Sequence, residues 1–253
     1  MRTLLCTILV LFSLTAAAQQ RAPLSPLGEK IQAAMQSDIR TEDEVARDRN
    51  RRPIETLEFL GLQDDMTVVE LMPGGGWYTK ILGQVLRGDG KLYLALGATR
   101  AGALAEQHQV LDEVEVLDVS AEFKPTDTRG IFGLDPFSLG VGNVDLVLTF
   151  RNMHNFDEEG RKAMTDAAFQ ALKPGGVFGV VDHTRRHMEP INSENRRRID
   201  PVLVIKEALD AGFEFAGYSP LHFKPDDELR YEVGRKSVTG NTDRFTLKFR
   251  KPE

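Results

Sequence analysis

The stretch Val68-Val69-Glu70-Leu71-Met72-Pro73-Gly74-Gly75-Gly76-Trp77-Tyr78-Thr79 decides the fold, because it predicts a buried strand, a glycine turn and the start of a helix. The β-branched run from Val68 to Leu71 is typical of a parallel strand that is covered on both faces. Three glycines then allow a sharp turn and leave room for a ligand against the main chain. Because ligands of open α/β sheets bind at the carboxyl ends of strands, this turn predicts the floor of a binding site.

Glu70 is the polar exception in the predicted strand. A carboxylate buried there is costly unless something hydrogen-bonds to it. One interpretation is that its partner is a ligand with hydroxyls or a positive charge. The other is that Glu70 caps the backbone of its own glycine turn.

Length and charge limit the class of protein. The 253 residues fit one α/β domain with a short extension. The formal net charge of −6 argues against an electrostatic nucleic-acid binder, so no nucleic-acid partner is expected. The oligomeric state does not follow from the sequence.

Residues 1–18 are predicted to be a secretory signal peptide. Arg2 supplies a positive start, Leu4 to Leu14 an apolar run, and Ala16-Ala17-Ala18 a small-residue cleavage site. The apolar run is too short to span a bilayer, and no later segment approaches its length, so no membrane span is expected in the mature chain. We therefore expect cleavage near Ala18 and a periplasmic or secreted protein. The single cysteine, Cys6, would be removed with the signal.

The rest of the chain divides into an N-terminal extension, 19–45, and one domain, 46–253. The extension is expected to be either a loose tail or a helix that packs late. Strands are predicted at 68–71, 91–96, 114–119, 144–150, 177–181, 213–218 and 244–250. Helices are predicted between them, whereas 120–143 is expected to be mainly loop. This alternation predicts a Rossmann-like, seven-stranded, mostly parallel sheet with helices on both faces, a three-layer α/β/α fold.

Three features together resemble class I S-adenosylmethionine-dependent methyltransferases over about residues 45–250. They are the element order, the acidic strand end before the glycine turn, and Leu172-Lys173-Pro174-Gly175-Gly176 before the fifth strand. The chain is most similar to exported bacterial predicted methyltransferases, which share an Arg-x-Pro helix start and a Pro-Gly-Gly-Gly-Trp-Tyr turn. These motifs are Arg51-Arg52-Pro53 and Pro73 to Tyr78 here.

The resemblance implies S-adenosylmethionine as the cofactor. The residues that it assigns to the cofactor are Glu70, Pro73, Gly74, Gly75, Gly76 and Trp77, with Asp118 or Ser120 near the adenine. Two positions depart from the family pattern. Met72 replaces the first glycine of the turn, and no carboxylate follows the second strand at Leu94-Ala95-Leu96-Gly97, where the family binds the ribose hydroxyls.

A nicotinamide-dependent dehydrogenase shares the sheet and the glycine turn but fits less well. Its motif needs a small residue where Thr79 stands, and an acid about 20 residues further on. Neither is present.

The segment after the fourth strand contains the candidate catalytic residues Arg151, Asn152 and His154. In the family that the chain resembles, the methyl acceptor binds at the edge of the sheet where this strand ends. Methyl transfer needs mainly proximity, with a base only if the nucleophile carries a proton. His154 is either that base or a histidine that packs the turn, and Arg151 and Asn152 are expected to line the pocket.

Other polar groups allow two further interpretations. His183 and His187 could join His154 at a metal, but these ligands would have to converge from separate loops, so no metal is predicted. The arginines before Pro53 form either a solvated helix start or an anion contact beside the site. Of the two aromatic residues in the turn, Tyr78 is expected in the core and Trp77 nearer the ligand.

The function predicted from these observations is an S-adenosylmethionine-dependent methyltransferase that acts on an unidentified, small-molecule substrate. The alternative is a non-catalytic small-molecule-binding module with a methyltransferase fold. Two observations motivate it: the predicted export away from a cofactor made in the cytoplasm, and the missing carboxylate after the second strand.

Overall fold

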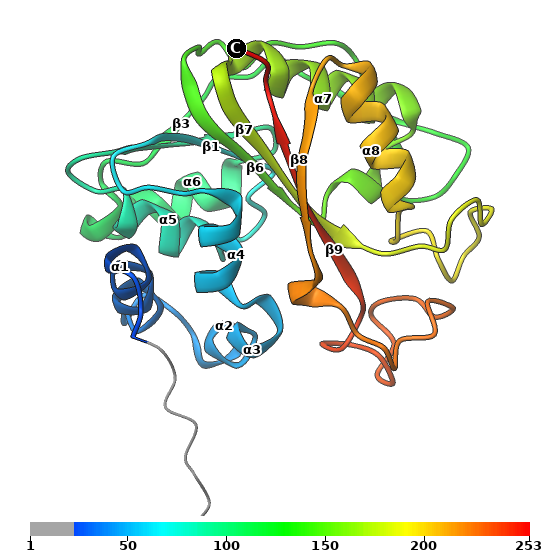
Figure 1. Cartoon of the computed structure of the whole chain (residues 1–253), viewed down its shortest axis with the longest axis horizontal. Coiled ribbons are helices and arrows are strands. Elements are labelled where there is room, and N and C mark those ends of the chain that lie inside the picture. The colour runs from blue at the N-terminus through cyan, green and yellow to red at the C-terminus, as the bar shows by residue number, and fades with distance from the viewer. Residues whose placement is uncertain (1–22) are drawn as a thin grey trace, which may run out of the picture.

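The computed structural model describes residues 23–253 and is built around one large twisted sheet (Figure 1). Within the described residues, the order of its seven strands is β3-β2-β1-β6-β7-β9-β8. Their bounds are β1 (Thr67–Leu71), β2 (Lys91–Ala95), β3 (Glu115–Val116), β6 (Val144–Phe150), β7 (Leu172–His183), β8 (Glu214–Ser219) and β9 (Arg244–Arg250). Only β9 runs antiparallel to its neighbours, β7 and β8. The predicted Rossmann-like, mostly parallel sheet is confirmed.

Helices cover both faces of the sheet, which gives the predicted three layers (Figure 1). One face packs against α7 (Glu158–Ala171) and α8 (Pro201–Asp210). The other packs against α1 (Pro26–Met35), α4 (Pro53–Leu60), α5 (Thr79–Val85) and α6 (Thr99–Glu106). Successive residues of β1 point to opposite faces, so Val68 and Val69 belong to different apolar clusters.

Helix ends follow the local sequence. Pro53 occupies the first turn of α4, and Gly61 ends that helix in a left-handed conformation with φ of 90°. Asp157 caps α7, because its side chain accepts a hydrogen bond of 2.8 Å from the Gly160 amide. Short helices α2 (Glu42–Ala46) and α3 (Asp48–Arg51) connect α1 to α4.

The N-terminal extension contains a packed helix rather than only a tail. Ile31 of α1 is fully buried with residues of α4 and α5. No helix within residues 23–253 is long and apolar enough to cross a membrane. The predicted signal peptide and its cleavage site lie outside the described residues.

The segment 120–143 is mainly loop, as predicted, with one short regular element. It contains a small antiparallel pair, β4 (Phe123–Pro125) and β5 (Phe132–Leu134). Each strand has only three residues, and Pro125 and Gly133 obscure their alternation. Strand β7 also begins at Leu172, earlier than the predicted 177, and β3 is shorter than the predicted 114–119.

The sheet places several chain segments at one edge. Its strand order reverses between β1 and β6, and the crevice beyond such a reversal is the usual ligand site of open α/β sheets. Because β9 is antiparallel, its first residue, Arg244, pairs with His183 at the end of β7. Helices α2 and α3 and the 223–243 connection lie toward the same end of the molecule (Figure 1).

Candidate functional site

The glycine turn leaves β1 through several left-handed residues. Met72, Gly74 and Gly76 have φ of 52°, 61° and 80°. Met72 therefore adopts the conformation that favours glycine, at the position where the resembled family has one. A Cβ on Gly76 would lie 2.6 Å from Leu104 Cδ2, so this glycine allows close packing against α6. A Cβ on Gly74 or Gly75 would meet no atom within 4 Å.

We call the space beside this turn the glycine-turn cavity. Its volume is about 330 Å³, within the size range of small-molecule sites. It is lined by Glu44, Arg51, Glu70, Met72, Pro73, Gly74, Gly75, Trp77, Tyr78, Arg100, Phe150, Arg151 and Asn152. Residues that follow β1 and residues that follow β6 therefore meet here, at the reversal of strand order.

Glu70 is only 2% exposed and faces this cavity. The Thr79 hydroxyl donates a hydrogen bond of 2.7 Å to its Oε2. Burial raises the pKa of Glu70 to about 7, although this hydrogen bond and the positive charge of Arg51 oppose the shift. In the described structure, Glu70 accepts no hydrogen bond from the backbone of its own turn.

Arg51 and the aromatic residues form one wall of the glycine-turn cavity. The Arg51 guanidinium lies 4.2 Å from the centroid of the Trp77 ring, and burial lowers the pKa of Arg51 to about 9. Trp77 Nε1 donates a hydrogen bond of 3.1 Å to the Glu44 carbonyl. Tyr78 stacks on Phe150 with ring centroids 3.6 Å apart. Both aromatic residues are buried, and both line the cavity.

The other arginines before Pro53 lie outside this wall. Arg49 and Arg52 are exposed, and Arg52 forms an ion pair with Glu55 at 2.8 Å. The anion-contact interpretation therefore has a structural basis only at Arg51.

Asn152 and Arg151 follow β6 and have different contacts. Asn152 Nδ2 donates hydrogen bonds of 3.2 Å to the carbonyls of Leu71 and Met72, so it joins the ends of β1 and β6. Arg151 has φ of 65°, and its amide donates to the Val181 carbonyl at 2.7 Å. The Arg151 side chain makes no ion pair with any described residue.

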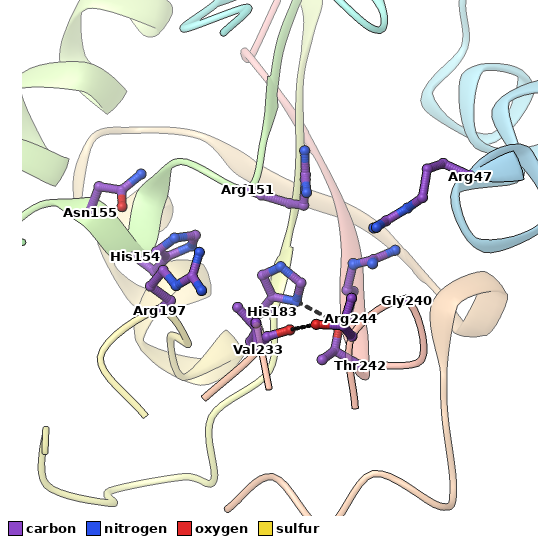
Figure 2. Close-up of a pocket in the computed structure, with 12 residues that line it drawn as sticks. Arg47, Arg151, His154, Asn155, His183, Arg197, Val233, Gly240, Thr242 and Arg244 are labelled. Atoms are coloured by element: carbon purple, nitrogen blue, oxygen red, sulfur yellow. Dashed lines mark hydrogen bonds between the residues drawn. The ribbon is translucent and has the colours of Figure 1, made fainter. Parts of the chain in front are cut away.

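A second space, which we call the arginine cavity, adjoins the first and has a volume of about 370 Å³ (Figure 2). It is lined by Arg47, Arg151, His154, Asn155, His183, Arg197, Val233, Gly234, Thr239, Gly240, Thr242 and Arg244. Arg151 lines both cavities. In Figure 2, Arg47, Arg151 and Arg244 converge on this space from three separate segments.

His154 is held by a buried carboxylate. Its Nδ1 lies 2.6 Å from Asp182 Oδ1, and its backbone amide donates to Asp182 Oδ2 at 3.1 Å. Donation from Nδ1 to Asp182 leaves Nε2 as the atom that can accept a proton. This is the orientation that a general base requires.

His183 is the other histidine of the arginine cavity. Its Nδ1 lies 3.1 Å from the Thr242 hydroxyl, the contact drawn in Figure 2. Burial holds the pKa of His183 well below its ordinary value, and the charge of Arg244 acts in the same direction. This histidine is therefore neutral at physiological pH.

The remaining predicted residues lie apart from these cavities. Asp118 and Ser120 are exposed and line neither of them. No carboxylate follows β2, and Arg100 is the charged residue that reaches the glycine-turn cavity from α6.

The histidines do not form a metal site. His187 binds Asp200 at 2.8 Å rather than joining His154 and His183. Within residues 23–253, no group of three or more His, Cys, Asp and Glu residues is placed to hold a metal ion.

The sequence did not point to Arg47, Arg197 and Arg244 as site residues. Arg244 begins the last strand, and only the antiparallel pairing with β7 brings it beside His183. Arg197 and the 233–242 residues come from segments with no regular pattern. The charge run before Pro53 was the one available signal, and Arg47 lies just outside it.

Comparison with protein-family models and with curated protein sequences finds no match. Solved structures do match. An S-adenosylmethionine-dependent methyltransferase from Aquifex aeolicus has a TM-score of 0.55 and 15% identity, covering 88% of this chain and 97% of that one. The [4+2]-cyclase SpnF has a TM-score of 0.55 and 15% identity, covering 86% of each chain.

A third similar structure holds the cofactor. The glycopeptide N-methyltransferase MtfA complexed with (S)-adenosyl-L-methionine has a TM-score of 0.51 and 14% identity, covering 81% of this chain and 94% of that one. At these identities the likeness shows the fold alone. The chain therefore shares the Rossmann-like fold of these S-adenosylmethionine-dependent methyltransferases.

Proposed function

We propose that the protein is an S-adenosylmethionine-dependent methyltransferase that acts on a small molecule outside the cytoplasm. The observation that carries this proposal is the glycine-turn cavity, which lies on a methyltransferase fold at the reversal of strand order.

The residues of the glycine-turn cavity fit the cofactor chemically. S-adenosylmethionine carries an ammonium, a sulfonium and a carboxylate. Glu70 offers a buried carboxylate to the cationic groups, and Arg51 offers a guanidinium to the carboxylate. The open space beside Gly74 and Gly75 lets a ligand approach the main chain. When bound, the cofactor would supply a methyl group whose carbon accepts an electron pair as the carbon–sulfur bond breaks.

The chain's own residues would position and deprotonate the acceptor. Arg151 lines both cavities, so a molecule in the arginine cavity lies beside the glycine-turn cavity. His154, held by Asp182, would accept the proton of an acceptor hydroxyl or amine at Nε2. Asn152 positions the ends of β1 and β6 rather than the acceptor, because its amide is bound to Leu71 and Met72.

The alternative is a non-catalytic module that binds another small molecule. The observation that favours it is the end of β2, where Leu96 and Gly97 follow the strand without a carboxylate and Arg100 lines the cavity. The cyclase among the similar structures is consistent with use of this fold beyond methyl transfer.

Ligand binding tests the proposal. S-adenosylmethionine or S-adenosylhomocysteine should raise the melting temperature of the purified mature chain, because a ligand that binds only the folded state stabilises it. Calorimetry should give a saturable isotherm. Absence of a shift at millimolar cofactor would contradict the proposal. A co-purifying molecule other than an adenosyl compound would favour the binding module.

The proposed localisation rests on the signal-like residues 1–18. Cell fractionation followed by N-terminal sequencing should find a protein that begins near Gln19. An intact Met1 in the cytoplasm would contradict export.

A further inference from the structure

The described residues that line the arginine cavity carry no negative charge, although the Asp182 carboxylate, which binds His154, also attracts Arg151 and Arg244. Four arginines and two histidines line it, and no aspartate or glutamate from residues 23–253 does. Arg197 alone among these arginines has a carboxylate partner, Glu232. Arg47, Arg151 and Arg244 form no ion pair in the described part of the chain.

Arg244 is the most buried of these three. It is 4% exposed, and its Nη1 donates a hydrogen bond of 3.0 Å to the Asn50 carbonyl. Its buried Nε has no hydrogen-bond partner, and neither has the buried Nε of Arg47. A buried donor without a partner is costly, so neither guanidinium is fully satisfied by the described residues.

The pKa values of Arg244 and Arg151 are lowered in this cavity, mainly by burial. Burial lowers the pKa of Arg244 to about 10, and the charges of Arg151 and Arg47 act in the same direction. Burial is also the main cause that lowers the pKa of Arg151. A bound anion would oppose both causes.

A third cavity, which we call the neighbouring cavity, shares His154 with the arginine cavity and shows that this excess of arginines over carboxylates is local. That cavity, of about 410 Å³, is lined by three arginines and also by Asp127, Asp157 and Glu158. Two of its arginines have buried carboxylate partners: Arg161 binds Glu207 at 2.6 Å, and Arg198 binds Asp227 at 2.9 Å. Among residues 23–253, three of the five buried arginines, Arg40, Arg161 and Arg198, have a carboxylate partner.

We propose that the arginine cavity binds an oxyanion, a carboxylate or phosphate group, carried by the methyl acceptor. Arg47, Arg151 and Arg244, which reach the cavity from three separate segments, hold the anionic group, and guanidinium groups suit both oxyanions because they donate in a planar fork. The assignment of this anion to a methyl acceptor rests on the proposed function. His154 lines the same cavity, so an anchored acceptor places a neighbouring O–H or N–H near its imidazole.

Binding of inorganic phosphate and of acetate tests the anion site without knowledge of the acceptor. Either probe should raise the melting temperature of the mature chain above that in sodium chloride of matched ionic strength. Which probe binds more tightly by calorimetry identifies the group. Arg47→Gln should raise the dissociation constant of the tighter-binding probe about ten-fold or more, as expected for a lost charged hydrogen bond. Arg244→Gln is a second variant and should have the same effect. If Arg244→Gln does not fold, Arg47→Gln still decides the question.

Arg185→Gln is the matched control. Arg185 is buried and also has an Nε without a partner, but it lines the neighbouring cavity. Its substitution should leave anion affinity within about two-fold. Equal binding by wild type and Arg47→Gln, or no stabilisation beyond sodium chloride, would overturn the anion site.

Binding of S-adenosylhomocysteine, measured on the same samples, separates the two proposals. If S-adenosylhomocysteine binds and neither anion does, the proposed function stands and the anion site is overturned. If an anion binds and neither adenosyl compound does, the anion site is supported, and its assignment to a methyl acceptor is overturned together with the proposed function.

Discussion

The two cavities lie at the same edge of the sheet and share Arg151, yet they are built in opposite ways. The glycine-turn cavity comes mainly from one continuous motif, and its lining includes the carboxyl groups of Glu44 and Glu70 beside its arginines. The arginine cavity draws on segments from Arg47 to Arg244 and, within residues 23–253, has no acidic lining residue. A local motif therefore indicates where the cofactor would bind, whereas long-range topology determines what acceptor the fold would accept.

The largest effect is expected from Asp227, which anchors the 223–243 segment, a segment that lines the arginine cavity. Its fully buried carboxylate binds Arg198 and accepts hydrogen bonds from the amides of Leu229 and Asp243. Asp227→Ala leaves the Arg198 charge buried and unpaired, so the free energy of unfolding should fall by about 3–5 kcal/mol. Urea denaturation measures this loss.

The affinities of the Asp227→Ala variant for phosphate and for S-adenosylhomocysteine compare the two cavities directly. Phosphate binding should weaken while S-adenosylhomocysteine binding is retained, because the 223–243 segment contributes only to the arginine cavity. Glu194→Gln is the control, since its ion pair with Arg235 is exposed and should contribute less than about 1 kcal/mol. Equal losses of unfolding free energy in Asp227→Ala and Glu194→Gln would contradict the prediction.

The next effect concerns Glu70 and pH. Its pKa is about 7 in the folded protein against 4.5 as its ordinary value, so the folded state binds more protons between these values. The stability that protonated Glu70 contributes is therefore complete below pH 4.5 and is lost as pH rises through 7. Relative to Glu70→Gln, the unliganded wild type should lose about 3 kcal/mol of unfolding free energy over this range. Unfolding at pH 4.5 and 8 measures the difference, and parallel curves would contradict it.

Cofactor affinity tests Glu70 from the other side. At pH 8 the carboxylate is charged, so Glu70→Gln should weaken S-adenosylmethionine binding by about 1.5–3 kcal/mol through loss of a charged hydrogen bond. Calorimetry on both proteins gives the value. Phosphate affinity is the internal control, because Glu70 does not line the arginine cavity. Unchanged cofactor affinity would remove Glu70 from the site.

Two adjacent glycines should separate binding from folding. Gly76→Ala forces φ of 80° on alanine and brings its Cβ to 2.6 Å from Leu104, so stability should fall by about 1–2 kcal/mol. Gly75→Ala meets no atom within 4 Å and should leave stability nearly unchanged while it weakens cofactor binding. Thermal unfolding and calorimetry on the pair test this division, which equal stability losses would refute.

The smallest effect is expected at Trp77. Trp77→Phe removes the hydrogen bond from Nε1 to the Glu44 carbonyl, which should cost about 1 kcal/mol of stability. Tyr78→Phe is the control, because the Tyr78 hydroxyl has only a long contact of 3.4 Å with the Arg51 carbonyl. Denaturation curves that coincide for Trp77→Phe and wild type would show that this bond contributes nothing.

Local patterns predicted the sheet well because its signals are short-range. The run from Val144 to Phe150 matches β6 at both ends, and a helix follows it as predicted, capped by Asp157. The three-residue pair β4–β5 was missed because its pairing depends on partners rather than on alternation. Gly175, with φ of 74°, lies inside β7, which begins five residues earlier than the predicted strand 177–181.

The candidate site was predictable only where neighbours in sequence are neighbours in space. Glu70, Gly74 and Trp77 line one cavity as the motif implied. The pairing of His154 with Asp182 joins residues that lie 28 positions apart, and Arg244 reaches His183 only through strand pairing. Such contacts depend on topology, which residue types alone do not determine.

The position of β9 in the sheet also affects the order in which the strands can pair during synthesis. This strand lies between β7 and β8, so β8 has no other partner in the sheet, yet β9 is the last sheet strand of the described chain to be synthesised. Synthesis proceeds from the N-terminus, so β8 must wait unpaired, with its backbone hydrogen-bonding groups open to other chains. Pairing of β8 therefore waits until β9 has been synthesised, and so does the contact of Arg244 with His183.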